Sequence, residues 1–317
     1  MSGLRKVITR PGEVIDFETV FEENSSLRTG VPTKKGTVER VEYTTDVYGD
    51  GKTYSKYCYV YLPYGYDAAD KSKRYNVLYF QHGNTCCPDM FAVGGNKYMF
   101  DMLFESGEIE PCIIAFVTYY FDPIGESEVR MRTGMASAGD GIGPNARCNY
   151  CTEVIESIIP TVEARYNTYL ENTSPEGIRA ARDHRAFSGY SRGAVATWRM
   201  LNKCFDYFRW YAPMSCMTHC DRGVKDIVTP EEVIEYVTSP IKANPDLPFF
   251  IYATNGGDSD IAEMTEQMKY LTKQDCFSYG TDPAKNNFYF SRSDYYHTDY
   301  LVPYYLWNSL KVLFRGM

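Results

Sequence analysis

The sequence lacks the features that would place the protein in a membrane or on a polyanion. No stretch approaches the roughly 18 uninterrupted apolar residues of a membrane-spanning helix, and the first residues show no signal peptide, because no apolar core precedes a small-residue cleavage site. Acidic residues outnumber basic ones by 41 to 33, which gives a net charge of −8. We therefore expect no nucleic-acid or membrane partner, since either would favour a basic face. The compartment stays open, with a secreted mature form ahead of a cytoplasmic protein.

The ten cysteines lack the spacing of a disulfide scaffold in a chain of 317 residues. Two groups could be read as metal ligands, Cys148 with Cys151 and Cys216 with His219 and Cys220. Neither group has the four well-placed nitrogen or sulfur ligands of a tetrahedral zinc site. We therefore expect buried or paired cysteines and no metal.

Strand-like and helix-like segments alternate along most of the chain, and the 44% apolar content can bury a full core. An antiparallel hairpin is predicted from segments 38–45 and 57–62. Further strands are predicted near residues 75–80, 111–117, 186–188, 210–215, 248–253 and 287–291. Helices are predicted at 97–105, 153–166, 229–238, 261–271 and 300–314. The pattern predicts one doubly wound, mostly parallel α/β domain over residues 37–317, with residues 1–36 as an N-terminal extension packed on it.

The most informative stretch runs from Gly189 to Gly193 and reads Gly-Tyr-Ser-Arg-Gly between a short apolar strand and a helix. A Gly-x-Ser-x-Gly turn in this setting strains the serine and exposes its Oγ, and the glycines remove Cβ atoms that would clash. The backbone N–H of Arg192 then points at any oxyanion formed on an attacked carbonyl. We predict that Ser191 is the nucleophile of an acyl transfer. The alternative is an ordinary glycine-rich turn with a surface serine.

Two later strand exits supply partners for Ser191. The α/β-hydrolase fold places its catalytic groups at the carboxyl ends of successive parallel strands, in the order serine, acid, histidine. Here Asp258 and Asp260 follow one predicted strand, and His297 follows the next. Because a histidine ordinarily has a pKa of about 6.5, it can take the serine proton at neutral pH. We predict that His297 is this base and that Asp260, ahead of Asp258, orients it.

A second oxyanion donor is expected where the strand near residue 80 runs into Gln-His-Gly-Asn. We predict the backbone N–H of Asn84 as this donor, with that of Gly83 next. His82 is expected to anchor the loop and to take no direct part in the chemistry. His184, which lies at the other end of the nucleophile strand, is expected to be structural.

Tyrosine is unusually frequent, with 29 residues, and its rings offer flat amphipathic surfaces to sugars and phenolic groups. Tyr119, Tyr120 and Tyr190 are the predicted substrate contacts. Residues 122–147 are rich in Gly, Ser and Asn and have no apolar period. Long loops in compact domains are often functional, so we predict a substrate-facing flap there, with a plain surface loop as the alternative.

Five stretches together resemble the esterase D-type members of carbohydrate esterase family 1, namely residues 59–67, 77–83, 159–166, 185–193 and 258–262. That family holds feruloyl and acetylxylan esterases, often joined to xylanases. The resemblance runs from about residue 38 to the C-terminus. It implies an α/β-hydrolase that cleaves an ester of plant xylan with Ser191, Asp260 and His297 and without a cofactor. The implied partner is feruloylated arabinoxylan or its oligosaccharides.

Two departures from the family pattern bear on the substrate. Arg192 stands where the family usually has methionine, and Cys86 and Cys87 follow the oxyanion turn where small or polar residues are usual. Both leave the N–H donors in place but can alter the preferred acid. We expect a feruloyl esterase first, and then an acetylxylan or short-chain carboxylesterase similar to S-formylglutathione hydrolases. A catalytically inactive carbohydrate-binding protein is the alternative from a different class.

Overall fold

The computed structural model describes residues 22–83, 86–92, 97–119, 144–218, 229–256, 260–293 and 296–316, without the side chains of residues 144–148 and 260–262. Within these ranges, eight strands form one sheet in the order β1-β2-β4-β3-β5-β6-β7-β8. The strands are β1 Thr37–Thr45, β2 Tyr54–Leu62, β3 Val77–Gln81, β4 Ile113–Val117, β5 Arg185–Tyr190, β6 Trp210–Met214, β7 Phe250–Asn255 and β8 Phe288–Arg292.

The sheet is antiparallel at one edge and parallel elsewhere. β1 pairs with β2 and β2 with β4 in antiparallel fashion, and the other five pairs are parallel. Gln81 at the end of β3 lies between Val117 of β4 and Gly189 of β5. We call the edge where the parallel strands end the rim, and the edge where they begin the foot.

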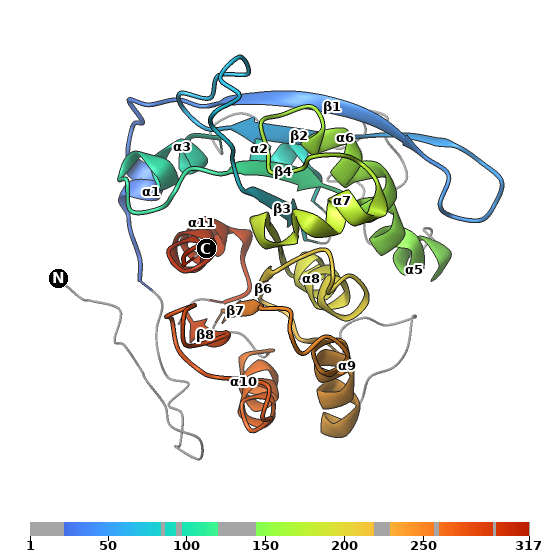
Figure 1. The fold of residues 1–317 in the computed structure, drawn as a ribbon. Coiled ribbons are helices and arrows are strands. Elements are labelled where there is room, and N and C mark those ends of the chain that lie inside the picture. Colours follow the sequence, from blue (N-terminus) through green and yellow to red (C-terminus); the bar gives the residue numbers. More distant parts are fainter. Residues whose placement is uncertain are drawn as a thin grey trace.

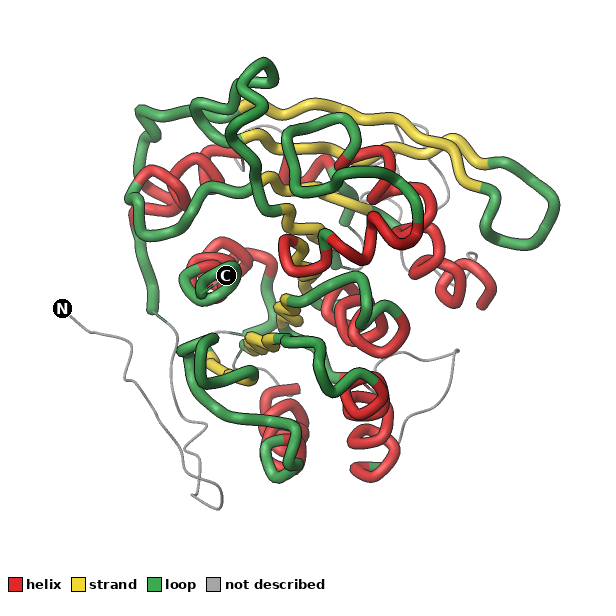
Figure 2. Tube along the Cα trace, viewed as in Figure 1, coloured by secondary structure: helices red, strands yellow, loops and turns green. Residues whose placement is uncertain are grey.

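Helices cover both faces of the sheet (Figures 1 and 2). The helices α5 to α9 lie on one face, where α10 packs against α9 and β7, and α1, α3 and α11 lie on the other. The α-helices are α1 Ser26–Thr29, α2 Asp89–Ala92, α3 Lys97–Glu105, α5 Pro144–Glu153, α6 Ile159–Glu163, α7 Pro175–Ala180, α8 Arg192–Lys203, α9 Pro230–Ala243, α10 Asp260–Leu271 and α11 Val302–Leu310. A π-helical turn η3 spans Val154–Ile158, and 3₁₀ turns span η4 Arg182–His184 and η6 Asp299–Leu301.

The predicted fold is confirmed as a doubly wound α/β sheet with an N-terminal antiparallel hairpin. The hairpin pairs Thr37–Thr45 with Tyr54–Leu62, and the helix predicted at 97–105 has these bounds. Three predicted helix ends differ by at least four residues. The helix predicted from 153 already begins at Pro144, because proline suits the first turn of a helix. The helix from 230 continues through Pro240 to Ala243, because Val237 and Ile241 are buried in the core.

The third difference is at the C-terminus, where a 3₁₀ turn precedes α11 and the helix ends at Leu310, short of the predicted 314. The described part of the N-terminal segment, residues 22–36, lies against this helix. The Asn308 amide accepts from the backbone N–H of Glu22 at 2.9 Å and donates to its carbonyl at 2.8 Å. The guanidinium carbon of Arg28 lies 3.3 Å from the Tyr300 ring centroid. The domain boundary at residue 37 stays a prediction.

Candidate active site

Ser191 occupies a strained turn between β5 and α8. Its backbone has φ 57° and ψ −115°, a region that non-glycine residues rarely adopt and that costs on the order of 1–3 kcal/mol. The surrounding structure holds this conformation, since the Ser191 N–H donates to the carbonyl of Met214 at 2.8 Å. The side chain is partly exposed, as a nucleophile must be.

The two glycines of the turn are required by close backbone contacts. A Cβ on Gly189 would lie 2.5 Å from the carbonyl carbon of Gly193. A Cβ on Gly193 would lie 2.1 Å from the carbonyl oxygen of Gln81. Both distances are below any normal contact, so the helix α8 can approach β5 and β3 only because these positions carry no side chain.

His297 lies beside Ser191, although 106 residues separate them in the sequence. Its Nε2 is 3.0 Å from the Ser191 Oγ, which is hydrogen-bonding distance. The imidazole also packs on the ring of Tyr190, with centroids 5.0 Å apart. A base within this distance of the hydroxyl is the arrangement that nucleophilic catalysis by serine needs.

The turn after β3 faces Ser191. A Cβ on Gly83 would lie 3.3 Å from the Ser191 Cβ, which places this backbone directly over the serine. The His82 ring is buried; its Nδ1 is 2.7 Å from the Gly83 carbonyl oxygen, and its Nε2 is 2.8 Å from the Thr118 hydroxyl. Because a carbonyl oxygen only accepts, Nδ1 carries a hydrogen. His82 therefore anchors the loop, as the sequence predicts.

The loops that follow β6, β7 and β8 are tied together at the rim. Ser215, directly after β6, has φ 56° and donates its N–H to the Thr254 carbonyl at 2.8 Å. Its Oγ accepts from the Gly256 N–H at 3.2 Å. The Ser293 N–H donates to the Asn255 carbonyl at 2.8 Å. These bonds fix the starts of the segments that carry Asp260 and His297. Sequence reasoning missed Ser215 as a linking residue, because nothing in the sequence signals a positive φ there.

Four of the predicted site residues lie wholly or partly outside the described residues. Asn84, Tyr120 and Asp258 fall in the gaps. Asp260 is the first residue of α10, at the rim, but its side chain is not described. Arg192 is the first residue of α8, where backbone N–H groups have no partner within the helix. The roles predicted for these residues stay predictions.

Tyr190 and Tyr119, two of the predicted substrate contacts, are more buried than expected, and their contact with substrate stays a prediction. Only 4% of Tyr190 is exposed, because the ring lies under the imidazole of His297. Tyr119 is partly buried between His82 and Tyr150, with ring centroids 5.8 Å away on each side. Tyr296, which precedes His297 in the sequence, is 71% exposed. Its position next to His297 was a signal that sequence reasoning did not use.

Within the described ranges, no three His, Cys, Asp or Glu side chains come together as a metal site. His219 and Cys220, and the side chain of Cys148, lie outside those ranges. Burial raises the pKa of the Cys86 thiol, beside the oxyanion turn, to about 12, so this thiol stays protonated at neutral pH. None of the described helices is long and apolar enough to cross a bilayer.

Comparison with protein families gives a match to the Esterase family model, described as "Putative esterase", over residues 56–220, just over half of the chain. The matched region holds the hairpin strand β2, the His82 turn and the Ser191 elbow.

Comparisons with individual proteins give similar results. The chain is 30% identical over 234 residues to endo-1,4-beta-xylanase Y of Acetivibrio thermocellus, covering 73% of this chain and 19% of the relative. It is 26% identical over 196 residues to an endo-1,4-beta-xylanase/feruloyl esterase of Xylanibacter ruminicola, covering 60% and 23%. The chain thus spans about a fifth of the length of these curated relatives.

Among solved structures, the chain resembles the feruloyl esterase module from Clostridium thermocellum, a serine-to-alanine mutant complexed with sinapinate. The TM-score is 0.75 and the sequence identity 26%, over 96% of this chain and 98% of the other. These findings confirm the predicted α/β-hydrolase fold and the resemblance to feruloyl esterases.

Proposed function

The chain belongs to the esterase family of carboxylic ester hydrolases, and we propose that it is a serine esterase that releases hydroxycinnamic acids, ferulate above all, from plant cell-wall arabinoxylan. The observation that carries the proposal is the 3.0 Å hydrogen bond between His297 and Ser191 at a strained strand-to-helix turn. A serine hydroxyl is a poor nucleophile unless a positioned base takes its proton, and this contact supplies one.

In the proposed reaction, His297 Nε2 takes the Ser191 proton while Oγ attacks the ester carbonyl. The tetrahedral intermediate collapses when the imidazolium returns that proton to the leaving sugar hydroxyl, which leaves a feruloyl-serine. Water then attacks this acyl-enzyme with the same base, releasing ferulate and restoring Ser191. Asp260 is proposed to hold the imidazole in the required tautomer and to stabilise its charge.

The negative charge of both intermediates is proposed to lie against backbone N–H groups. One is that of Arg192, at the positive end of α8, which runs for 12 residues. The other is proposed at Asn84, directly after the His82–Gly83 turn. Removing one such donor commonly costs about 10²–10³-fold in kcat.

Two observations favour a hydroxycinnamoyl ester. One relative is named an endo-1,4-beta-xylanase/feruloyl esterase, and the similar solved structure is a feruloyl esterase module complexed with sinapinate, a hydroxycinnamate. The ring of Tyr296 is largely exposed next to the base and can stack on a phenolic or sugar ring. The proposed substrates are therefore feruloylated arabinoxylan and its oligosaccharides.

The proposal is tested by parallel hydrolysis of methyl ferulate and acetylated xylan. We expect ferulate release that falls by at least about 10⁴-fold in Ser191→Ala, together with loss of labelling by a fluorophosphonate. Asp260→Asn is expected to lower kcat by about 10⁴-fold. Asp258→Asn is expected to retain most of the wild-type kcat. The matched control His184→Gln, at the foot, retains activity.

Release of acetate without ferulate would reject the feruloyl preference and favour the acetylxylan or short-chain alternative. If Ser191 took no label and neither ester were cleaved while xylan still bound, the protein would be the inactive binding form.

A further inference from the structure

A buried ion pair lies behind the rim between β2 and the end of α5. The side chains of Lys56 and Glu153 are 1% and 0% exposed, and Nζ is 2.6 Å from Oε1. The Tyr43 hydroxyl donates to Oε1 at 2.7 Å, and the Tyr48 hydroxyl donates to Oε2. Burial, and then the charge of Glu153, raise the pKa of Tyr43 well above its ordinary value, so this hydroxyl remains a donor.

Stability alone does not account for such a pair. Well-packed apolar side chains of the same volume commonly stabilise a fold as well as a buried ion pair or better. Glu153 also stands directly before the π-helical turn Val154–Ile158. π-helical turns are rare and occur frequently at functional sites.

A continuous hydrogen-bond path leads from this pair to the turn over the nucleophile. Lys56 Nζ donates to the Thr118 carbonyl at 3.2 Å. The Thr118 hydroxyl is 2.8 Å from His82 Nε2, and His82 Nδ1 donates to the Gly83 carbonyl at 2.7 Å. All of these side chains are buried, so water competes little for the bonds.

The end of this path sets the direction of a peptide group. The bond from His82 Nδ1 restrains the direction of the Gly83 carbonyl, which belongs to the turn that faces Ser191. Because Gly83 lies against Ser191, a change in this turn alters the backbone donors offered to an oxyanion.

We propose that Lys56 and Glu153 are positioning residues, which act through Thr118 and His82 to hold the His82–Gly83 turn in its oxyanion-binding orientation. The inference rests on the proposed function and extends it to residues that never touch substrate. Its effect falls on kcat, because only the transition state carries the oxyanion charge.

The hydrogen bond between Thr118 and His82 gives the cleanest test. Thr118→Val keeps the shape of the side chain but removes the hydroxyl that meets His82, whereas Thr118→Ser keeps the hydroxyl. With methyl ferulate, we expect Thr118→Val to lower kcat by about 10–100-fold with KM within about twofold. Affinity for phenylboronic acid, which forms a tetrahedral adduct with a catalytic serine, should fall in parallel. Thr118→Ser should recover most of both.

The ion pair itself is tested by separating activity from stability. Lys56→Met leaves Glu153 buried without its cation, so both the unfolding midpoint and kcat should fall. The double variant Lys56→Met/Glu153→Met removes the unpaired charge and should recover the midpoint, but it lacks the tether to Thr118 and should keep the low kcat. The matched control is Arg185→Met, which breaks the equally buried Arg185–Glu163 pair at the foot and should lose stability without losing kcat.

The outcomes separate this inference from the proposed function. A wild-type protein that cleaves no ester and takes no fluorophosphonate label would overturn both. A wild type that cleaves methyl ferulate while Thr118→Val retains its kcat overturns the positioning role alone. So does recovery of kcat together with stability in the double variant, since that is the behaviour of a purely structural pair.

Discussion

Two buried ion pairs in the described part of the chain each join a basic side chain to a glutamate, and they lie at opposite edges of the sheet. Glu153 and Glu163 sit ten residues apart on the α5-η3-α6 stretch, about 15 Å along its axis. Glu153 meets Lys56 behind the rim, and Glu163 meets Arg185 at the foot through bonds of 2.5 and 2.8 Å from Nε and Nη2. Each carboxylate also accepts a tyrosine hydroxyl, from Tyr43 and Tyr79 respectively.

The two cations differ in the further groups to which they donate hydrogen bonds. Lys56 donates to the Thr118 carbonyl, and the Thr118 hydroxyl meets His82 in the turn over Ser191. Arg185 donates to the carbonyl of Ile178 in helix α7, at the foot of the sheet. The proposed positioning role therefore applies to Lys56 and not to Arg185, because only the hydrogen bonds of Lys56 lead to the turn over Ser191.

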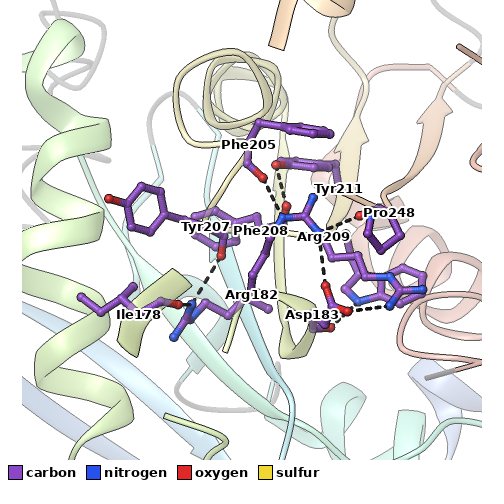
Figure 3. A network of polar contacts seen from close by, with 11 residues as sticks. Ile178, Arg182, Asp183, Phe205, Tyr207, Phe208, Arg209, Tyr211 and Pro248 are labelled. Atoms are coloured by element: carbon purple, nitrogen blue, oxygen red, sulfur yellow. Dashed lines mark hydrogen bonds and ion pairs between the residues drawn. The ribbon is translucent and has the colours of Figure 1, made fainter. Parts of the chain in front are cut away.

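Two further arginines at the foot, Arg182 and Arg209, also hydrogen-bond groups of other segments (Figure 3). Arg182 donates from Nε to the Phe205 carbonyl at 2.9 Å and from Nη1 to the Pro248 carbonyl at 2.6 Å. Arg209 donates to Asp183 at 2.9 Å. The guanidinium fork is suited to this task, because it holds several carbonyl groups in fixed directions at once. These side-chain bonds join segments at the foot, whereas backbone bonds around Ser215 join the described starts of the loops after β6, β7 and β8.

The largest expected effect on stability comes from breaking the foot pair. Arg185→Met leaves Glu163 buried and unpaired, which commonly costs about 3–5 kcal/mol of unfolding free energy. Urea denaturation should show this loss, and the double variant Arg185→Met/Glu163→Met should recover much of it. Under conditions where the variant is folded, kcat for methyl ferulate should match the wild type. A fall in kcat of the folded variant would remove the distinction between the two edges.

A smaller effect should come from removing one hydroxyl at each edge. Tyr79→Phe and Tyr43→Phe each delete a hydrogen bond to a buried carboxylate, and such bonds contribute about 1.5–3 kcal/mol. We expect similar losses of unfolding free energy from urea titrations. Only Tyr43→Phe should also lower kcat, because only Glu153 leads to the His82 turn. Equal kcat values for the two variants would argue against this difference.

How far the sequence predicts this molecule depends on whether a constraint is local. The Ser191 elbow is predictable, because the close backbone contacts at Gly189 and Gly193 exclude any side chain there and leave a recognisable pattern. The meeting of Ser191 with His297 follows from strand order, since both follow the carboxyl ends of parallel strands. Local signals and topology were sufficient for these residues.

Contacts between distant segments had no such signal. Nothing near Lys56 in the sequence indicates that its amine meets Glu153, 97 positions later. That pairing depends on how the α5-η3 stretch packs on the strands β1 and β2. The burial of Tyr190 was missed for a related reason. A residue next to a nucleophile suggests contact with substrate, but here β5 lies in the middle of the sheet and the His297 loop covers the ring.

The smallest expected effect concerns His184, the histidine of the foot. Its ring stacks on Tyr169 at 3.4 Å between centroids, and its Nδ1 is 2.8 Å from Asn76 Oδ1. Burial is the main cause that lowers the pKa of His184 below the ordinary 6.5. The negative charge of Asp183 acts in the opposite direction, and the positive charge of Arg185 lowers the pKa further. The unfolded chain therefore binds a proton at this site more readily than the folded one, so stability falls as the pH drops below about 6.5.

His184→Gln removes the titrating group, so its unfolding free energy should decline less steeply than that of the wild type between pH 7 and 5. Urea titrations at these two pH values measure the difference, and kcat at pH 7 should be unchanged because the residue lies across the sheet from Ser191. Equal pH dependence in the two proteins would mean that the ring takes up its proton as easily when folded. That result would contradict the partial shielding of the His184 ring from water by its stacking on Tyr169.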